Sequence, residues 1–169
     1  KGYIAYVVVA IGLAVVSGMY AEMSVPKLII WVIFAAFSAI ASELIVGMSA
    51  MHSGWFPGFA TALIFLLVGM MIGFPKVPLG ILAGYTAATG PAFSDMAYDL
   101  KCGYILRGNG ADPEFERAGR KQQYIAEIIS FCVAFVVVLA MFNTYFEQDM
   151  FAPVSRTFVT TIDAGSSPE

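Results

Sequence analysis

The chain has 169 residues, of which 59% are hydrophobic and 12% are charged, and its formal net charge is −3. A soluble domain is about half apolar and about one-quarter charged, so this composition excludes an ordinary soluble domain and predicts an all-α, polytopic membrane protein. The basic residues are scattered and form no stripe, so we expect the lipid bilayer as a partner and no nucleic acid.

Five hydrophobic segments approach the roughly 20 apolar residues that a helix needs to cross the bilayer core. We expect them at about residues 3–19, 28–51, 56–74, 77–105 and 124–146 of one transmembrane helical domain covering residues 1–169. The chain opens on Lys1 without a methionine and ends in a polar tail at residues 147–169. We therefore expect an internal piece of a longer chain, with the remaining helices as partners.

Small and aromatic residues in these segments suggest packing roles. Glycines recur at four-residue intervals in Gly54/Gly58, Gly69/Gly73 and Gly80/Gly84. This spacing places a flat stripe on one side of a helix and predicts contacts between helices rather than contacts with a substrate. Aromatic residues near the segment ends, Trp31 and Tyr124 among them, fit anchoring at the membrane interface.

The fourth segment is interrupted by Gly90-Pro91. Proline lacks a backbone N–H and suits the first position of a helix, so the pair predicts a segment that is broken there and either spans the membrane or re-enters it. A plain proline kink, relieved by neighbouring helices, is the alternative. A broken helix at membrane depth has to line a cavity or be buried in protein, and a cavity would suit the passage of a hydrophilic solute.

Ionisable side chains follow this point, where a membrane helix ordinarily stays apolar. On a helix that starts at Pro91, Asp95 and Asp99 share one face, whereas Ser94, Tyr98 and Lys101 share the adjoining one. Pairing at the membrane rim is the alternative role for Asp95, Asp99 and Lys101. The residues that we expect to bind a substrate are Tyr85, Thr86, Thr89, Gly90, Ser94, Asp95, Tyr98, Asp99 and Lys101.

Glu43 is the one charged residue within the second segment. An unpaired charge in lipid is costly, so Glu43 is neutral, paired or facing a cavity, and an ionisable residue at such a position is a functional hypothesis by default. We assign proton coupling to Glu43 and Asp95. Glu127 lies near the start of the fifth segment, and we interpret it as structural.

Five basic residues lie between residues 101 and 121, more than in any other connection. By the positive-inside bias, the expected loop at residues 106–123 is cytoplasmic, and we place the chain in the cell (inner) membrane. His52 is the single histidine, so we expect neither a metal site nor a cofactor. The sequence has no nucleophile elbow, phosphate loop or HExxH pair and gives no indication of an enzyme.

Residues 90–104, GPAFSDMAYDLKCGY, resemble the oligopeptide transporter family, which includes the yellow stripe-like metal-chelate transporters. The core Asp99-Leu-Lys101-x-Gly103-Tyr104 is similar to that family's D-[LF]-K-x-G-[YH] stretch. Arg120 and Gln122-Gln123 match approximately the arginine and glutamines that follow it in the family. Cys102 stands where the family often has threonine. The resemblance is strongest over residues 52–146.

The resemblance implies a secondary active transporter that takes up oligopeptides or peptide-like metal chelates together with protons. Its partners would be the small substrate, protons and the other helices of the transporter, and a homo-oligomer is compatible with it. The alternative, from a different class, is a non-transporting membrane subunit that uses its glycine stripes to assemble with a larger complex.

Overall fold

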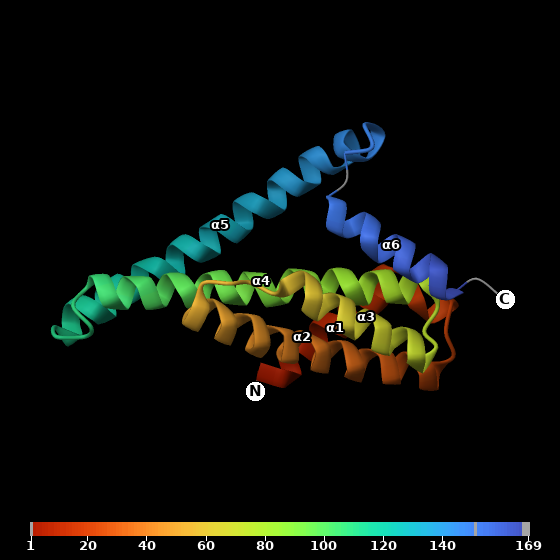
Figure 1. Ribbon diagram of the computed structural model, residues 1–169, viewed down its shortest axis with the longest axis horizontal. Helices are drawn as coiled ribbons and strands as arrows, with labels where there is room; N and C mark the ends of the chain where they lie inside the picture. The colour runs from red at the N-terminus through yellow and green to blue at the C-terminus, as the bar shows by residue number, and fades with distance from the viewer. Residues whose placement is uncertain (1, 151, 167–169) are drawn as a thin grey trace.

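The computed structural model describes residues 2–150 and 152–166, and over that range the chain is helical and contains no strand (Figure 1). Its elements are α1 Gly2–Val16, the 3-10 turn η1 Met19–Ala21, α2 Val25–Ser53, α3 Gly58–Ile72, α4 Lys76–Leu106, α5 Pro113–Glu147 and α6 Pro153–Ser166. Helices α2 and α5 are long and apolar enough to cross a membrane, and α1 and α3 are shorter apolar helices. The predicted class, an all-α membrane protein, is confirmed.

Helix α4 is central to the arrangement. It packs mainly against α2 and α3, and α1 packs against α2 (Figure 1). Helix α5 leaves the C-terminal end of α4 and rises away from the bundle, and α6 returns toward the start of α4, where Lys76 and Asp163 form an ion pair at 2.8 Å. The most apolar stretch of α5 is uncovered within the described chain.

The connection between α4 and α5 is much shorter than expected. Residues 106–123 were predicted to be a loop, but α5 already begins at Pro113, and the prediction is wrong for most of that range. The physical reason is a strong helix start: the Asp112 side chain accepts hydrogen bonds from the backbone N–H groups of Glu114 and Phe115 at 3.0 and 3.1 Å, and Pro113 occupies the first turn. The expected polar tail at residues 147–169 likewise contains α6.

Helix α4 runs without interruption through Gly90-Pro91, so the predicted break or re-entrant segment is wrong. Hydroxyl groups of Thr86, Thr89 and Ser94 donate hydrogen bonds to the carbonyl oxygens four residues earlier, at 2.9, 3.0 and 2.7 Å. Neighbouring helices and hydroxyl side chains are the means by which membrane helices tolerate proline. None of these three bonds goes to the Ala87 carbonyl, which Pro91 leaves without an N–H donor. The Gly-Pro pair nevertheless lies within a continuous helix.

The Gly90-Pro91 pair lies where three helices come closest. A Cβ atom on Gly90 would collide with the Ser42 hydroxyl of α2, and a Cβ atom on Gly58 of α3 would lie 2.6 Å from the Pro91 Cγ atom. Gly69 of α3 has the same role further along, since an added Cβ atom there would lie 2.8 Å from the Leu82 Cδ2 atom. Glycine at these positions allows the helix backbones to approach each other.

Two expectations about packing need correction. Gly54, Gly80 and Gly84 belong to the predicted contact pairs, yet within the described chain no atom of another helix lies within 4 Å of a Cβ atom built on any of them. Trp31 was expected at the membrane interface, but it is fully buried and its indole Nε1 donates a hydrogen bond to the Pro78 carbonyl at 3.0 Å. Trp31 lies on the side of α2 that faces α4, so position near a helix end did not determine its environment.

We expect Gly58→Ala to lower the free energy of unfolding by about 1–3 kcal/mol, the usual cost of overpacking a tight contact. The added methyl group meets the rigid Pro91 ring rather than a mobile side-chain end. Thermal unfolding of the purified full-length protein measures the effect. Pro91→Ala removes the ring, so the double variant should recover much of the loss; strictly additive effects of the two substitutions would contradict this contact.

Candidate functional site

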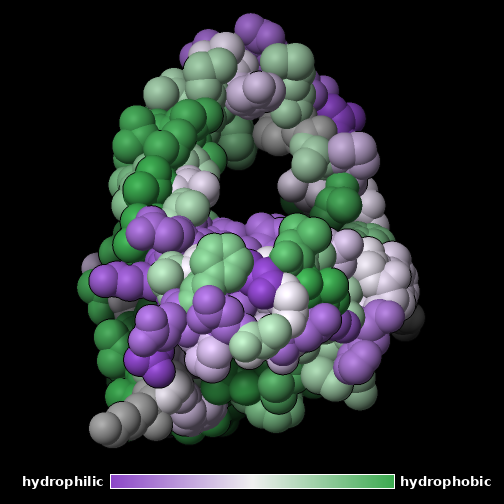
Figure 2. Space-filling view, turned by 90° about the vertical axis from the view of Figure 1, so that its left-hand side faces the viewer, coloured by the Kyte–Doolittle hydropathy of each residue, from purple (hydrophilic) through white to green (hydrophobic). Residues whose placement is uncertain are grey.

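An opening passes between the bundle and the two arms formed by α5 and α6 (Figure 2). Exposed residues of α4 repeat along one side of the helix at Gly80, Gly84, Ala88, Asp95 and Asp99. Because α2 and α3 pack on the opposite side, this stripe is the uncovered side of α4. It changes from small, uncharged residues to carboxylates along its length, and it is the candidate surface for a hydrophilic solute.

The structure divides the predicted substrate-binding residues between two sides of α4. Tyr85, Thr86, Gly90 and Ser94 are buried among the packed helices, and Thr89 is half-buried. Asp95, Tyr98, Asp99 and Lys101 are exposed. The buried members make up the α2–α4 contact, as the Ser42 hydroxyl bonded to the Thr86 carbonyl at 3.4 Å illustrates. Only the exposed members can touch a solute directly in this conformation.

The acidic part of the stripe faces the first turns of α5. A crevice of about 260 Å³ lies there, and Asp99, Gln123 and Glu127 contribute to its lining. The Gln123 amide Nε2 donates a hydrogen bond to the Asp99 carbonyl at 2.8 Å, and Glu127 lies close to Asp99 and Asp95. Glu127 was interpreted as structural, and its spacing of four residues from Gln123 was the available signal that the two share a face.

The α4–α5 hairpin is also held by a buried ion pair. The Arg107 guanidinium donates two hydrogen bonds to the Glu116 carboxylate, at 2.7 and 3.1 Å, with both side chains almost covered. Glycines make room for this arginine: an added Cβ atom would lie 2.6 Å from its Nη1 atom at Gly103 and 2.5 Å from its Cδ atom at Gly119. This two-pronged bond fixes the register of the two helices.

Glu43 of α2 lies at a separate junction of three helices. Its carboxylate accepts a hydrogen bond from the Tyr6 hydroxyl of α1, and the Tyr85 hydroxyl of α4 donates to the Tyr6 carbonyl at 3.4 Å. Of the alternatives that the sequence left open, the structure shows a partnered carboxylate. Tyr6 had not been singled out, because nothing in the sequence of α1 links it to a residue 37 positions away.

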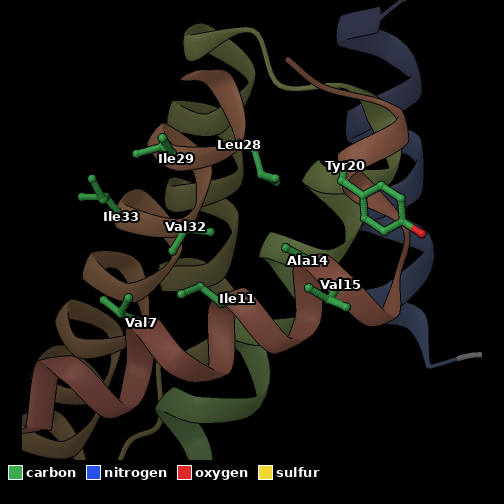
Figure 3. A pocket seen from close by; sticks show the side chains of 9 residues that line it. All are labelled: Val7, Ile11, Ala14, Val15, Tyr20, Leu28, Ile29, Val32 and Ile33. Carbon is green, nitrogen blue, oxygen red and sulfur yellow. The ribbon is translucent and has the colours of Figure 1, made fainter. Parts of the chain in front are cut away.

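A further crevice, of about 350 Å³, lies between α1 and α2 and is lined by apolar side chains such as Val7, Ile11, Leu28 and Val32 (Figure 3). Tyr20 supplies the one polar side-chain group among the labelled residues. A charged or zwitterionic solute would find almost no hydrogen-bonding partners there. We therefore assign the candidate site to the uncovered side of α4.

Within residues 2–150 and 152–166, no group of three or more His, Cys, Asp or Glu side chains is arranged to hold a metal ion. Cys102 and Cys132 are not joined in a disulfide.

Long apolar helices and a polar stripe along one of them define an integral membrane protein. A family model described as OPT oligopeptide transporter protein matches residues 2–169, so the chain belongs to this family. The resemblance inferred from residues 90–104 is confirmed. Comparison with the curated proteins and with the solved structures gives no match. Members of this family are membrane transporters of oligopeptides and not enzymes.

Glu116→Gln should lower the melting temperature of the full-length protein, because it leaves the covered Arg107 guanidinium without its counter-charge. Glu114→Gln is the matched control, since Glu114 lies in the same first turn and its side chain is exposed; we expect a change within about 0.5 kcal/mol for that variant. Equal melting temperatures for the two variants would show that the pair does not hold the hairpin.

Proposed function

We propose that the chain forms part of a secondary active transporter that takes up oligopeptides or peptide-like metal chelates together with protons. Membership of the OPT family over residues 2–169 carries the proposal, and the exposed polar side of α4 beside the opening supports it. The positive-inside bias supports a cytoplasmic position for the α4–α5 connection, in the cell membrane.

The exposed carboxylates suit a peptide substrate. A peptide carries an amino terminus whose ammonium group donates charge-assisted hydrogen bonds, and Asp95 and Asp99 offer acceptors for them one helical turn apart. Tyr98 lies beside Asp99 and adds an amphipathic ring, while Thr89 borders the same surface. The buried Tyr85, Thr86, Gly90 and Ser94 would shape this surface through the α2–α4 contact.

Asp95→Asn should weaken substrate binding about 10- to 100-fold, because a hydrogen bond to a charged group contributes about 1.5–3 kcal/mol. Uptake of a labelled dipeptide or tripeptide into proteoliposomes that contain the full-length protein, under an imposed pH gradient, gives the apparent affinity. Glu114→Gln changes the same charge away from the opening and should transport normally. An unaltered affinity in Asp95→Asn would show that the Asp95 carboxylate does not bind the substrate.

Proton coupling is assigned first to Glu43. The Tyr6 hydroxyl donates to a charged Glu43 carboxylate more strongly than to a neutral carboxyl group, so protonation of Glu43 weakens the bond that joins α1 to α2. The Tyr85 hydroxyl links the same junction to α4. A proton bound at Glu43 would thereby alter the packing of the helix that carries the substrate surface. Asp95, close to Glu127, is the second candidate.

Glu43→Gln should abolish accumulation driven by a pH gradient while preserving exchange of labelled for unlabelled substrate at equal pH. Glutamine keeps the shape of the side chain but cannot cycle a proton. Tyr6→Phe, which removes the donor, should shift the pH dependence of uptake. Glu22→Gln, an exposed carboxylate next to η1, is the control. Gradient-driven accumulation at the wild-type level in Glu43→Gln would exclude Glu43 as the coupling residue.

The uncovered apolar length of α5 favours a second candidate function, assembly of a larger complex by a subunit that does not itself transport. Gly69 would support such assembly only indirectly, because it already packs against Leu82 within the chain. Absence of uptake by a folded full-length protein, together with loss of a stable complex when the exposed Ile128 and Val136 of α5 are changed, would favour this alternative.

A further inference from the structure

We propose that the crevice between the C-terminal end of α2 and the α4–α5 hairpin binds the phosphate headgroup of an anionic phospholipid. Its volume is about 390 Å³, and its lining combines Lys101 and Tyr104 from α4 with Arg120 and Tyr124 from α5. It lies on the opposite side of the hairpin from the acidic crevice. The site is distinct from the proposed substrate surface and does not depend on the transport function.

The side chains that line this crevice carry a net positive charge. Within the part of the chain that the structure describes, neither Lys101 nor Arg120 forms an ion pair. The Lys101 ammonium donates to the Met51 carbonyl near the end of α2, which uses one of its three N–H groups and leaves its charge uncompensated by a carboxylate. Glu116 also lines the crevice, but both its oxygens accept hydrogen bonds from Arg107.

The two basic groups, Lys101 and Arg120, come from different helices and lie at the same level of the α4–α5 hairpin. Arg120 and Tyr124 follow Glu116 at intervals of four residues, and Ala97, Lys101 and Tyr104 recur at four and three residues, so each set forms a stripe along one helix face. The Arg107–Glu116 bond aligns α4 with α5 at this level. A guanidinium and an ammonium that converge on one crevice are suited to the oxygens of a phosphate group.

The crevice lies at the boundary between the polar and the apolar part of α5, and this position favours a lipid over a soluble anion. Helix α5 is mostly polar up to Gln123 and, apart from Glu127 and Ser130, apolar from Ile125 to Leu139, with Ile125, Ile128 and Ile129 exposed. Figure 2 shows hydrophilic residues gathered at the end of the molecule where α4 meets α5, beside hydrophobic flanks. A phosphate held by Lys101 and Arg120 would thus have its acyl chains along an apolar helix surface, with tyrosines at the boundary.

The test uses the purified full-length protein in a neutral detergent and counts bound lipid by native mass spectrometry. We expect dioleoylphosphatidylglycerol to bind in preference to dioleoylphosphatidylcholine, which has the same acyl chains and no net charge. Each basic group near a membrane surface contributes about a fivefold factor, so Lys101→Gln with Arg120→Gln should weaken binding of phosphatidylglycerol by about 25- to 30-fold.

The matched control is Arg117→Gln with Lys121→Gln, which removes the same charge from the same region at exposed positions that do not line the crevice. This control should bind phosphatidylglycerol almost as wild type does, and circular dichroism confirms that both double variants remain helical. If both double variants lose the same affinity for phosphatidylglycerol, the lipid responds only to the overall charge of the region, and the proposed site is wrong. Displacement of the lipid by inorganic phosphate at a comparable concentration would also overturn it, because the crevice would then recognise a soluble anion.

Discussion

The close packing of α4 against α2 and α3 is the constraint on which the rest of the structure depends. Two polar backbones approach closely only where side chains are small, and Gly58, Gly69 and Gly90 provide those places. The hydroxyls of Thr86, Thr89 and Ser94 bond to carbonyl oxygens of α4 itself instead of remaining unsatisfied. Helix α4 is continuous through Pro91, and one side of it packs against the bundle while the other remains uncovered.

This division of α4 into two sides explains why its polar residues have different environments. Ser94 and Asp95 are neighbours in sequence, yet Ser94 is completely buried and Asp95 is exposed. The carboxylates therefore face the opening, and Lys101 faces the end of α2. A single helix thus presents negative charge to one crevice and positive charge to another, with the α4–α5 hairpin between them.

Local patterns in the sequence predicted much of the fold, but they could not predict what depends on neighbours. The helical class followed from apolar length, and of the three alternatives left open for Glu43 (neutral, paired or facing a cavity) the structure shows the paired one. Its partner Tyr6 lies on another helix, which no spacing in the chain specifies. Pro91 was interpreted by its own preference, whereas it lies inside a continuous helix and packs closely against Gly58 of α3. Asp112-Pro113 suited a turn and a helix start equally well, and the accepted hydrogen bonds select the helix start.

The attachment of α5 has a mechanical consequence. Among the described residues, this helix meets α4 only over its first turns, where Arg107 and Glu116 join the two. A helix of 35 residues extends for about 50 Å at 1.5 Å per residue. Over that length, a rotation of a few degrees at the hairpin displaces the far end by several ångström, and α6, which packs against α3 and α4, opposes such a displacement by joining that end to the bundle.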